Sequence, residues 1–522
     1  MEQHRVPVLV AGGSLVGLST SVLLADQGVP HLLVESHRGT AIHPRAASFH
    51  QRTMEAFRSV GLQEAVEQAA AGEFLQNGAI MAVESLGGKE LAYFFHSYNE
   101  GVEGLSPTDR LFVTQVGLEP VLRERAAGLG AEHRFGTELV SFEQHDDHVR
   151  SVIRSRDDGT EEVVVSDYLV AADGAHSRIR ERLGIAMSGR GSFADCVTIY
   201  FKADVRPMLG DRNLSVVYVN HPNLLGFFRF SITADSGFLA VFSTTAADGT
   251  RDTSVGEDMP TERCIELVRT ALGCPPDHPV DIESVQRWSA SAATAERLSD
   301  GRVFLAGDAA HVMPPTGGFG GNTGVADAHN LAWKLAMVTK GRAGPGLLAS
   351  YDEERRPVGE LTVEQAYTRY VLRVDPSLPQ DDLQPPLDDA SIELGAIYRS
   401  GAVADTSPPE APLDDPRSRS WAPGTRAPHV EVADGRSTVD VAGHGLAVVT
   451  EAAPEDWAKV VDEASRSLGV PIGVHQVGPD SGLQGAALLR PDGVVAWRTS
   501  EAPTVAGLDV VLAELLDRRP PA

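Results

Sequence analysis

The residues with the clearest chemical signature form a glycine-rich segment near the N-terminus, GGSLVG, from Gly12 to Gly17. An apolar run before it, residues 6–12, predicts a buried strand, and the apolar spacing of residues 17–28 predicts a helix. Small residues in such a turn let the backbone approach a diphosphate, whose charge the free N–H groups of the helix bind. We therefore predict that a dinucleotide is bound by Gly12, Gly13, Ser14, Leu15 and Gly17. The alternative is an ordinary glycine-rich turn, since Ser14 replaces the middle glycine of the usual pattern.

Three further segments extend this prediction. A second strand is expected to end in Glu35, 18 residues after Gly17, where a carboxylate can accept hydrogen bonds from a ribose. In residues 168–184, Asp173 and Gly174 follow an apolar strand and Arg180 lies on the next helix. In residues 301–336, a strand ends at Gly307 and Asp308, and a loop crowded with glycines leads into a helix.

Taken together, these segments resemble the FAD-dependent hydroxylases of the para-hydroxybenzoate hydroxylase class. The rest of the chain resembles the aromatic polyketide hydroxylases of that class, such as aklavinone and tetracenomycin hydroxylases. The resemblance implies an α/β protein with a Rossmann-like FAD-binding domain, an inserted antiparallel-sheet substrate domain and a C-terminal thioredoxin-like domain. It also implies hydroxylation of an aromatic, polycyclic polyketide-like substrate through a C4a-hydroperoxyflavin, with FAD as cofactor and NAD(P)H and O2 as co-substrates. NAD(P)H is expected to bind transiently, because no second dinucleotide motif occurs.

The resemblance also implies roles for individual residues. The expected FAD contacts beyond the first turn are Glu35, Arg45, Gln115, Leu139, Asp173, Asp308, Gly321 and Asn322. Pro315 is expected beside the flavin ring, and the backbone N–H groups of Gly321 and Asn322 beside flavin N1 and O2. Those N–H groups would stabilise the negative charge of a reduced flavin. For Arg45 the alternative is a surface arginine, and for Leu139 it is core packing.

Residues 211–245 read as three antiparallel strands, with turns at 220–223 and 234–237. A sheet laid over the flavin would form a mostly apolar substrate cavity. Tyr218, Phe228 and Arg229 are the candidate substrate residues, with core or surface positions as the alternative. Arg373, on a helix after the third motif, is a candidate catalytic cation that would stabilise a phenolate or a flavin alkoxide; a solvated arginine is the alternative.

Composition excludes several other functions. The chain has 522 residues, and 45 lysines and arginines against 72 acidic residues give a net charge of −27, which would repel nucleic acid. Three cysteines without a CxxC pair argue against a disulfide framework or a zinc site and fit a reducing cytoplasm. Residues 6–25 are mostly apolar, loosely like a signal peptide, but glycines and serines interrupt them at the offsets of a strand, turn and helix. No other run approaches the roughly 18 apolar residues of a membrane span. We therefore expect a small-molecule aromatic partner and no metal, membrane or nucleic acid.

The predicted domain boundaries follow the motifs. Residues 1–73, 99–186 and 286–374 form the FAD-binding domain, residues 74–98 and 187–285 the substrate domain, 375–428 a linker and 429–522 the thioredoxin-like domain. No cysteine follows Cys274, so redox exchange in the last domain is excluded, and support of packing or of a homodimer is the expected role.

Two alternatives use the same scaffold. The flavin could support Baeyer–Villiger or another oxidative modification of a polycyclic natural product or antibiotic. A binding protein without chemistry is disfavoured, because it would have no reason to keep both the phosphate-binding turn and Asp308.

Overall fold

The computed structural model describes residues 3–42, 47–245, 251–252, 255, 259–404, 411–452 and 454–518. Its central unit is an eight-stranded sheet whose main path runs β17-β18-β10-β1-β2-β7, with β8 and β9 attached through β10. The pairs from β18 to β7 are all parallel. The strands span Gln3–Ala11 (β1), His31–Glu35 (β2), Glu132–Phe135 (β7), Thr137–Gln144 (β8), Val149–Ser155 (β9), Glu161–Ala171 (β10), Ser299–Asp300 (β17) and Val303–Leu305 (β18). The inner residues of β1, β2 and β18 are apolar because both faces of the sheet are buried there.

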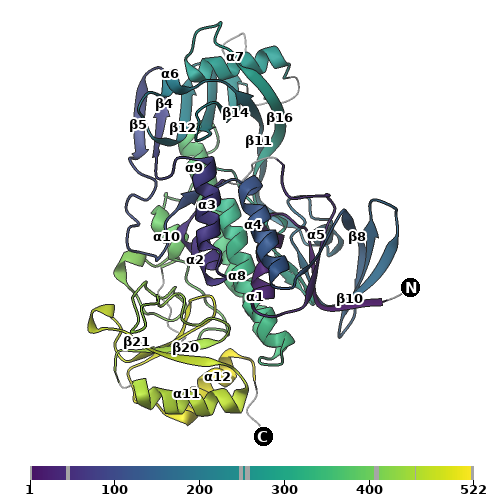
Figure 1. The fold of residues 1–522 in the computed structure, drawn as a ribbon, viewed down its shortest axis with the longest axis vertical. Coiled ribbons are helices and arrows are strands. Elements are labelled where there is room, and N and C mark those ends of the chain that lie inside the picture. The colour runs from purple at the N-terminus through teal and green to yellow at the C-terminus, as the bar shows by residue number, and fades with distance from the viewer. Residues whose placement is uncertain are drawn as a thin grey trace.

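Helices pack along this sheet, and Figure 1 shows α1, α4 and α8 side by side in the middle of the molecule. The long helix α9 runs from this layer up to the second sheet (Figure 1). The helices of this unit span Leu15–Asp26 (α1), Gln51–Ser59 (α2), Gln63–Glu73 (α3), Gln115–Gly128 (α4), Arg178–Arg182 (α5), Phe319–Thr339 (α8), Ser350–Arg373 (α9) and Asp389–Leu394 (α10). A two-stranded ladder joins β3 (Ser48–Phe49) to β6 (Leu111–Phe112).

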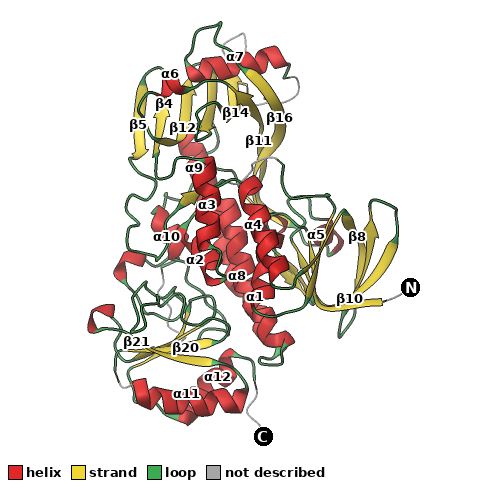
Figure 2. Ribbon diagram, in the orientation of Figure 1, coloured by secondary structure: helices red, strands yellow, loops and turns green. Residues whose placement is uncertain are grey.

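A nine-stranded sheet lies at one end of the molecule, with the main order β19-β16-β11-β14-β13-β12-β4-β5 (Figure 2). Its strands pair antiparallel except β12 with β4. They span Ala79–Val83 (β4), Glu90–Phe95 (β5), Met187–Lys202 (β11), Leu214–His221 (β12), Leu224–Phe230 (β13), Ser236–Thr245 (β14), Arg251–Asp252 (β15), Asp281–Ala295 (β16) and His311–Val312 (β19). Helix α7 (Thr261–Leu272) and the short α6 (Arg206–Leu209) flank it. Residues 74–98, assigned to the substrate domain from sequence, contribute β4 and β5 to this sheet.

The C-terminal unit is a four-stranded sheet, in the order β21-β20-β22-β23, with two helices. Its elements are β20 (Leu446–Thr450), α11 (Pro454–Leu468), β21 (Ile472–Gln476), β22 (Ala486–Leu489), β23 (Val495–Thr499) and α12 (Val505–Leu515). Apolar residues of this sheet share one core with Trp333 and Met337 of α8. The residues between α9 and β20 also carry α10, of which Ile392 and Leu394 are buried.

Buried ion pairs join the C-terminal unit to helices α8 and α9 of the central unit. Glu354 of α9 accepts from Lys334 of α8 at 2.8 Å and from Arg490 at 2.6 and 2.9 Å. Arg490 also donates to Asp492 at 2.6 Å, and all four side chains are at most 2% exposed. Because a buried charge is costly without its partner, these contacts hold α8 and α9 in one arrangement with the last sheet.

Among the residues that the structure describes, no helix combines the length and apolarity needed to cross a bilayer. The same residues contain no cluster of three or more His, Cys, Asp or Glu side chains placed to hold a metal. Cys196, Cys264 and Cys274 are all free thiols.

Candidate active site

The first glycine-rich turn is built by close backbone contacts. Gly12 has a φ of +107°, a conformation that side chains rarely adopt, and a Cβ there would lie 2.6 Å from the carbonyl carbon of Ala172. A Cβ on Gly17 would lie 2.8 Å from the carbonyl carbon of Gly12 and closer still to its oxygen. Ser14 is the N-cap of α1, and Leu18 makes the first N–H bond back to it. The start of α1 therefore packs closely against the end of β1, and the first N–H groups of the helix lie at the carboxyl edge of the sheet.

Glu35 lies at the end of β2 behind this turn. Its carboxylate accepts the N–H of Gly13 at 2.6 Å and that of His37 at 2.7 Å, and it is 8% exposed. Burial opposes ionisation, but the hydrogen bonds from His37 and Gly13 outweigh it and hold the pKa of Glu35 below its usual value. Glu35 therefore stays ionised beside the turn, as an acceptor for hydroxyl groups must.

The second and third motifs meet the first one at the same sheet edge. Asp173 follows β10; its Oδ2 accepts from the N–H of Ile179 at 3.3 Å, whereas its buried Oδ1 has no hydrogen-bond partner. Burial raises the pKa of this carboxyl. Asp308 is exposed in the one-turn helix Gly307–Ala309 that follows β18. Arg180 donates to the carbonyl of Ala309 at 3.0 Å, which ties the two motifs together.

Helix α8 begins with unsatisfied donors. Its N-cap, Gly318, has a φ of +70°, and no side chain caps the helix. Among the described residues, no acceptor is found for the N–H groups of Phe319, Gly320, Gly321 and Asn322. The Gly318 carbonyl instead accepts from the side-chain amide of Asn322 at 2.7 Å. This start therefore presents an array of free N–H groups that suits a negative charge.

The side chain of Asn322 has a structural role of its own. Its amide donates to the carbonyl of Ser48 at 2.9 Å, and its oxygen accepts from the N–H of His50 at 2.9 Å and from the hydroxyl of Thr53 at 2.6 Å. These bonds join the start of α8 to β3 and α2. A cavity of about 60 Å³ lies behind them, lined in part by His50, Phe319 and Asn322.

Other predicted cofactor residues lie around this edge. Gln115, the first residue of α4, donates to the Ser14 hydroxyl at 3.2 Å. Leu139 is half-buried on β8 and packs against the main core. Pro315 is exposed in the loop before α8, where its carbonyl accepts from Gly318. Arg45 lies outside the described residues.

One residue at this edge was missed from sequence. Glu119, one helical turn after Gln115, accepts the Ser14 hydroxyl and the N–H of Ala41, both at 2.6 Å, and the Gln115 amide at 3.1 Å. It is fully buried. The sequence offers one signal for this residue. Glu119 is a charged residue on the inner face of the α4 helix pattern, four residues after the predicted contact Gln115.

Strand pairing in the nine-stranded sheet shows which of the predicted substrate residues lie on the same face. Tyr218 pairs with Phe227 across β12 and β13, so both lie on one face, and Arg229 shares it two residues on. Phe228 points to the opposite face, where it is fully buried in the core formed with α7. Phe228 therefore does not share a face with Tyr218 and Arg229, contrary to the prediction that groups the three, because side chains alternate along a strand; Phe227 lies with them instead.

Arg373, the last residue of α9, meets this face. Its guanidinium lies 5.2 Å from the centre of the Phe94 ring, which is edge-on to Tyr218 with ring centres 5.6 Å apart. Burial raises the pKa of the Tyr218 phenol, although the charge of Arg373 and a hydrogen bond from it act in the opposite direction. Arg373 and Tyr218, predicted separately, are thus neighbours.

Arg229 is an unusual buried cation. Its guanidinium lies between the rings of Phe74 and Phe112, 3.8 and 3.6 Å from their centres, and Nη1 donates to the carbonyl of Ala47 at 3.2 Å. Its Nε and Nη2 are buried without a partner, and burial lowers the pKa of Arg229 to about 9. A guanidinium held this way is prepared for an anionic partner.

The comparisons with known proteins agree with this geometry. The FAD binding domain family matches residues 5–366, and the aromatic-ring hydroxylase C-terminal family matches residues 420–519. The chain belongs to the FAD-dependent aromatic-ring hydroxylases. It is 47% identical to a 4-methyl-5-nitrocatechol 5-monooxygenase of Burkholderia sp, over 98% of each chain. It is 39% identical to a tetracenomycin B2 monooxygenase-dioxygenase of Streptomyces olivaceus, over 99% of this chain and 100% of the relative.

A solved structure has the same fold. The ternary complex of aklavinone-11 hydroxylase with FAD and aklavinone superposes with a TM-score of 0.91 at 37% identity, covering 99% of this chain and 100% of that one. The enzyme is therefore an FAD-dependent monooxygenase of the aromatic hydroxylase class, with the α/β architecture predicted from sequence. The resemblance to aklavinone and tetracenomycin hydroxylases is confirmed.

Proposed function

We propose that the FAD of this hydroxylase lies along the edge where the three motifs meet. Its diphosphate would bind at the start of α1 beside Gly12 and Gly17, and its adenosine ribose at Glu35. Asp308 would bind nearer the flavin end. Three features support this placement: the close backbone approach at Gly12, the unpartnered oxygen of Asp173, and the uncapped start of α8. Bound FAD would supply the redox chemistry, accepting a hydride from NAD(P)H and activating O2.

The chain's own residues would orient and stabilise that chemistry. The free N–H groups at Gly321 and Asn322 suit the negative charge of a reduced ring system, as expected from the resemblance. Asn322 holds this helix start in place through Ser48, His50 and Thr53. Pro315, in the loop directly before it, would border the ring. One oxygen atom of O2 would enter the substrate and the other would leave as water.

The sheet face above this loop supports an aromatic, phenolic substrate. Tyr218, Phe227 and Phe94 offer ring faces and edges, with Phe94 36% exposed, while Arg229 and Arg373 supply positive charge. A wide aromatic surface stabilises a flat, fused ring system by stacking, and a cation favours its phenolate. We therefore propose a polycyclic, polyketide-like phenol as the substrate. The observation that carries this proposal is the buried guanidinium of Arg229, two of whose nitrogens have no hydrogen-bond partner among the described residues.

A smaller substrate is the second candidate, because 47% identity links the chain to a monooxygenase of 4-methyl-5-nitrocatechol. The name of that relative places oxygenation at ring carbon 5, which bears the nitro group. A catecholate would suit the same cations.

The test is NAD(P)H oxidation by the FAD-loaded enzyme with naphthacene-type polyketides, anthraquinones, 4-methyl-5-nitrocatechol and simple phenols. The proposal predicts that a polycycle accelerates oxidation and gains one oxygen on an aromatic carbon, seen by mass spectrometry and NMR. Turnover of the nitrocatechol with nitrite release, and none of any polycycle, would establish the second candidate. Oxygen inserted into a ring C–C bond would show Baeyer–Villiger chemistry instead.

A further inference from the structure

Glu119 joins three segments of the cofactor edge that are distant in sequence. One carboxylate oxygen accepts from Ser14 in the first turn and from Gln115 on its own helix, and the other accepts from Ala41 in the loop after β2. The N–H of Leu15, in the first turn of α1, is also a hydrogen-bond partner. Donors from the start of α1, from α4 and from the loop after β2 thus converge on one fully buried carboxyl.

This carboxyl occupies part of the region where a diphosphate would bind. The N–H groups in the first turn of α1 attract an anion, and one of them, the N–H of Leu15, already donates a hydrogen bond to Glu119. Ser14, the N-cap, does not cap the helix with its side chain, because its hydroxyl donates to Glu119 instead. A diphosphate at the same helix start would therefore place further negative charge beside a buried carboxyl.

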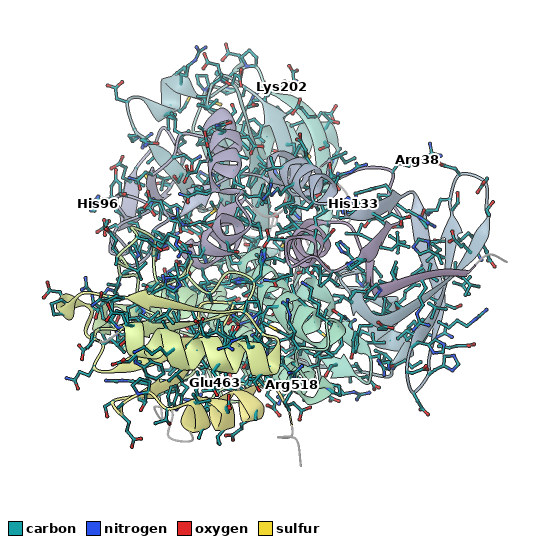
Figure 3. All side chains as sticks on the ribbon, turned by 60° about the horizontal axis from the view of Figure 1, so that its bottom comes forward. Arg38, His96, His133, Lys202, Glu463 and Arg518 are labelled. Atoms are coloured by element: carbon teal, nitrogen blue, oxygen red, sulfur yellow. The ribbon has the colours of Figure 1, made fainter. Side chains whose placement is uncertain are left out.

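Among the residues that the structure describes, the charged groups on the neighbouring elements do not compensate it. The first turn of α1 carries no charged residue. Glu35 at the end of β2 is an ionised acid, and His37 after it hydrogen-bonds to Glu35. Arg38 lies at the surface (Figure 3), 81% exposed, and pairs with Asp157 at 2.6 Å.

The remaining neighbours are also acidic. Glu73 of α3 accepts from Thr114 at the start of α4, and Asp173 and Asp308 end their strands on the same edge. Within the described residues, the carboxyl of Glu119 thus has donors but no cation against it. Burial raises its pKa above the usual value even before a phosphate binds.

We propose that Glu119 is a proton-linked positioning residue: it holds Ser14, Gln115 and Ala41 around the start of α1 and takes up one proton from solvent when the FAD diphosphate binds there. The proton removes the repulsion between carboxylate and phosphate, and the neutral carboxyl becomes a hydrogen-bond donor. This inference rests on the proposed placement of FAD. Since the bound form holds one more proton, FAD binding weakens as pH rises, by up to about tenfold in Kd per pH unit.

The test titrates the FAD-free full-length enzyme with FAD between about pH 6 and pH 9, following flavin fluorescence. Glu119→Gln keeps the shape and mimics the neutral carboxyl, so its Kd should lose this slope and be lower than that of wild type at high pH. Glu124→Gln, at an exposed position of the same helix, is the matched control and should behave as wild type. Asp173→Asn shows how much of the slope belongs to the half-buried carboxyl of Asp173, whose pKa is also raised.

Calorimetry in two buffers of different ionisation enthalpy counts the protons directly. Wild type should take up a proton that Glu119→Gln does not. Equal uptake by the two proteins, the same pH slope, or loss of FAD binding by Glu119→Gln at every pH would overturn the proposal. If Glu119→Gln fails to fold, the wild-type measurement by itself still tests the proposal, because absence of proton uptake on FAD binding would overturn it. Failure of wild type to bind FAD, or full FAD binding by Gly17→Ala, would instead refute the placement of the cofactor.

Discussion

The substitution Gly17→Ala tests whether the first turn binds the diphosphate of FAD. The new Cβ would lie 2.8 Å from the Gly12 carbonyl carbon, whereas non-bonded carbons stay about 3.5 to 4.0 Å apart. The start of α1 must therefore move by roughly 0.7 Å or more. Hydrogen bonds of about 2.9 Å from its N–H groups to phosphate would then exceed 3.5 Å and be lost.

The magnitude follows from the number of donors. Two free N–H groups, those of Val16 and Gly17, are at stake, and a hydrogen bond to a charged group contributes about 1.5 to 3 kcal/mol. The loss of about 3 to 6 kcal/mol corresponds to a rise in the Kd for FAD of roughly 10² to 10⁴. The enzyme should lose its yellow colour during purification, and titration with FAD gives the Kd.

The control is a glycine-to-alanine substitution at a position where the added methyl group has space. A Cβ on Gly72, inside α3, would meet nothing within 4 Å. Gly72→Ala should keep wild-type FAD affinity and gain up to about 1 kcal/mol of stability from helix propensity. A Gly17→Ala enzyme that binds FAD within about threefold of wild type would refute the placement of the diphosphate at this turn.

Four further outcomes are expected. Glu354→Gln leaves Arg490 buried without its full counter-charge and should lower the free energy of unfolding, measured in urea, by about 3 to 5 kcal/mol. Glu360→Gln, in an exposed pair on the same helix, should lower it by less than about 1 kcal/mol. Equal losses in the two variants would contradict the role of the buried network. Removal of FAD should lower stability by about 2.7 kcal/mol relative to enzyme with a hundredfold excess over Kd, seen as a lower Tm. Arg373→Gln should yield more peroxide and less hydroxylated product per NAD(P)H; unchanged coupling would exclude a catalytic role. Arg229→Met should raise the KM for a phenolic substrate roughly tenfold or more while leaving FAD affinity unchanged, and an unaltered KM would argue against substrate contact.

Residues whose roles depend on local structure could be placed from sequence. Gly12, Gly17 and Glu35 belong to one strand–turn–helix–strand unit, whose geometry follows from apolar runs and small residues a few positions apart. The observed strand and helix agree with that expectation within three residues, because apolar spacing and the glycine turn are properties of a short stretch of chain.

Residues whose roles depend on distant contacts could not be placed in this way. Glu119 is defined by Ala41 and Ser14, 78 and 105 residues away. Phe228 was assigned to the wrong face because alternation shows that neighbours face opposite sides, but only packing against α7 shows which side is which.

The sequence by itself determined the family, the cofactor and the three turns at the sheet edge, since each turn is a local solution to binding an anion or ending a strand. The tertiary structure alone decided how those turns meet and that Arg373 contacts the Tyr218 face. It also showed that two nitrogens of the Arg229 guanidinium have no hydrogen-bond partner among the described residues, and that a buried carboxyl lies at the start of α1. Burial and pairing set the charge of a side chain, and both depend on residues brought together only by the folded chain.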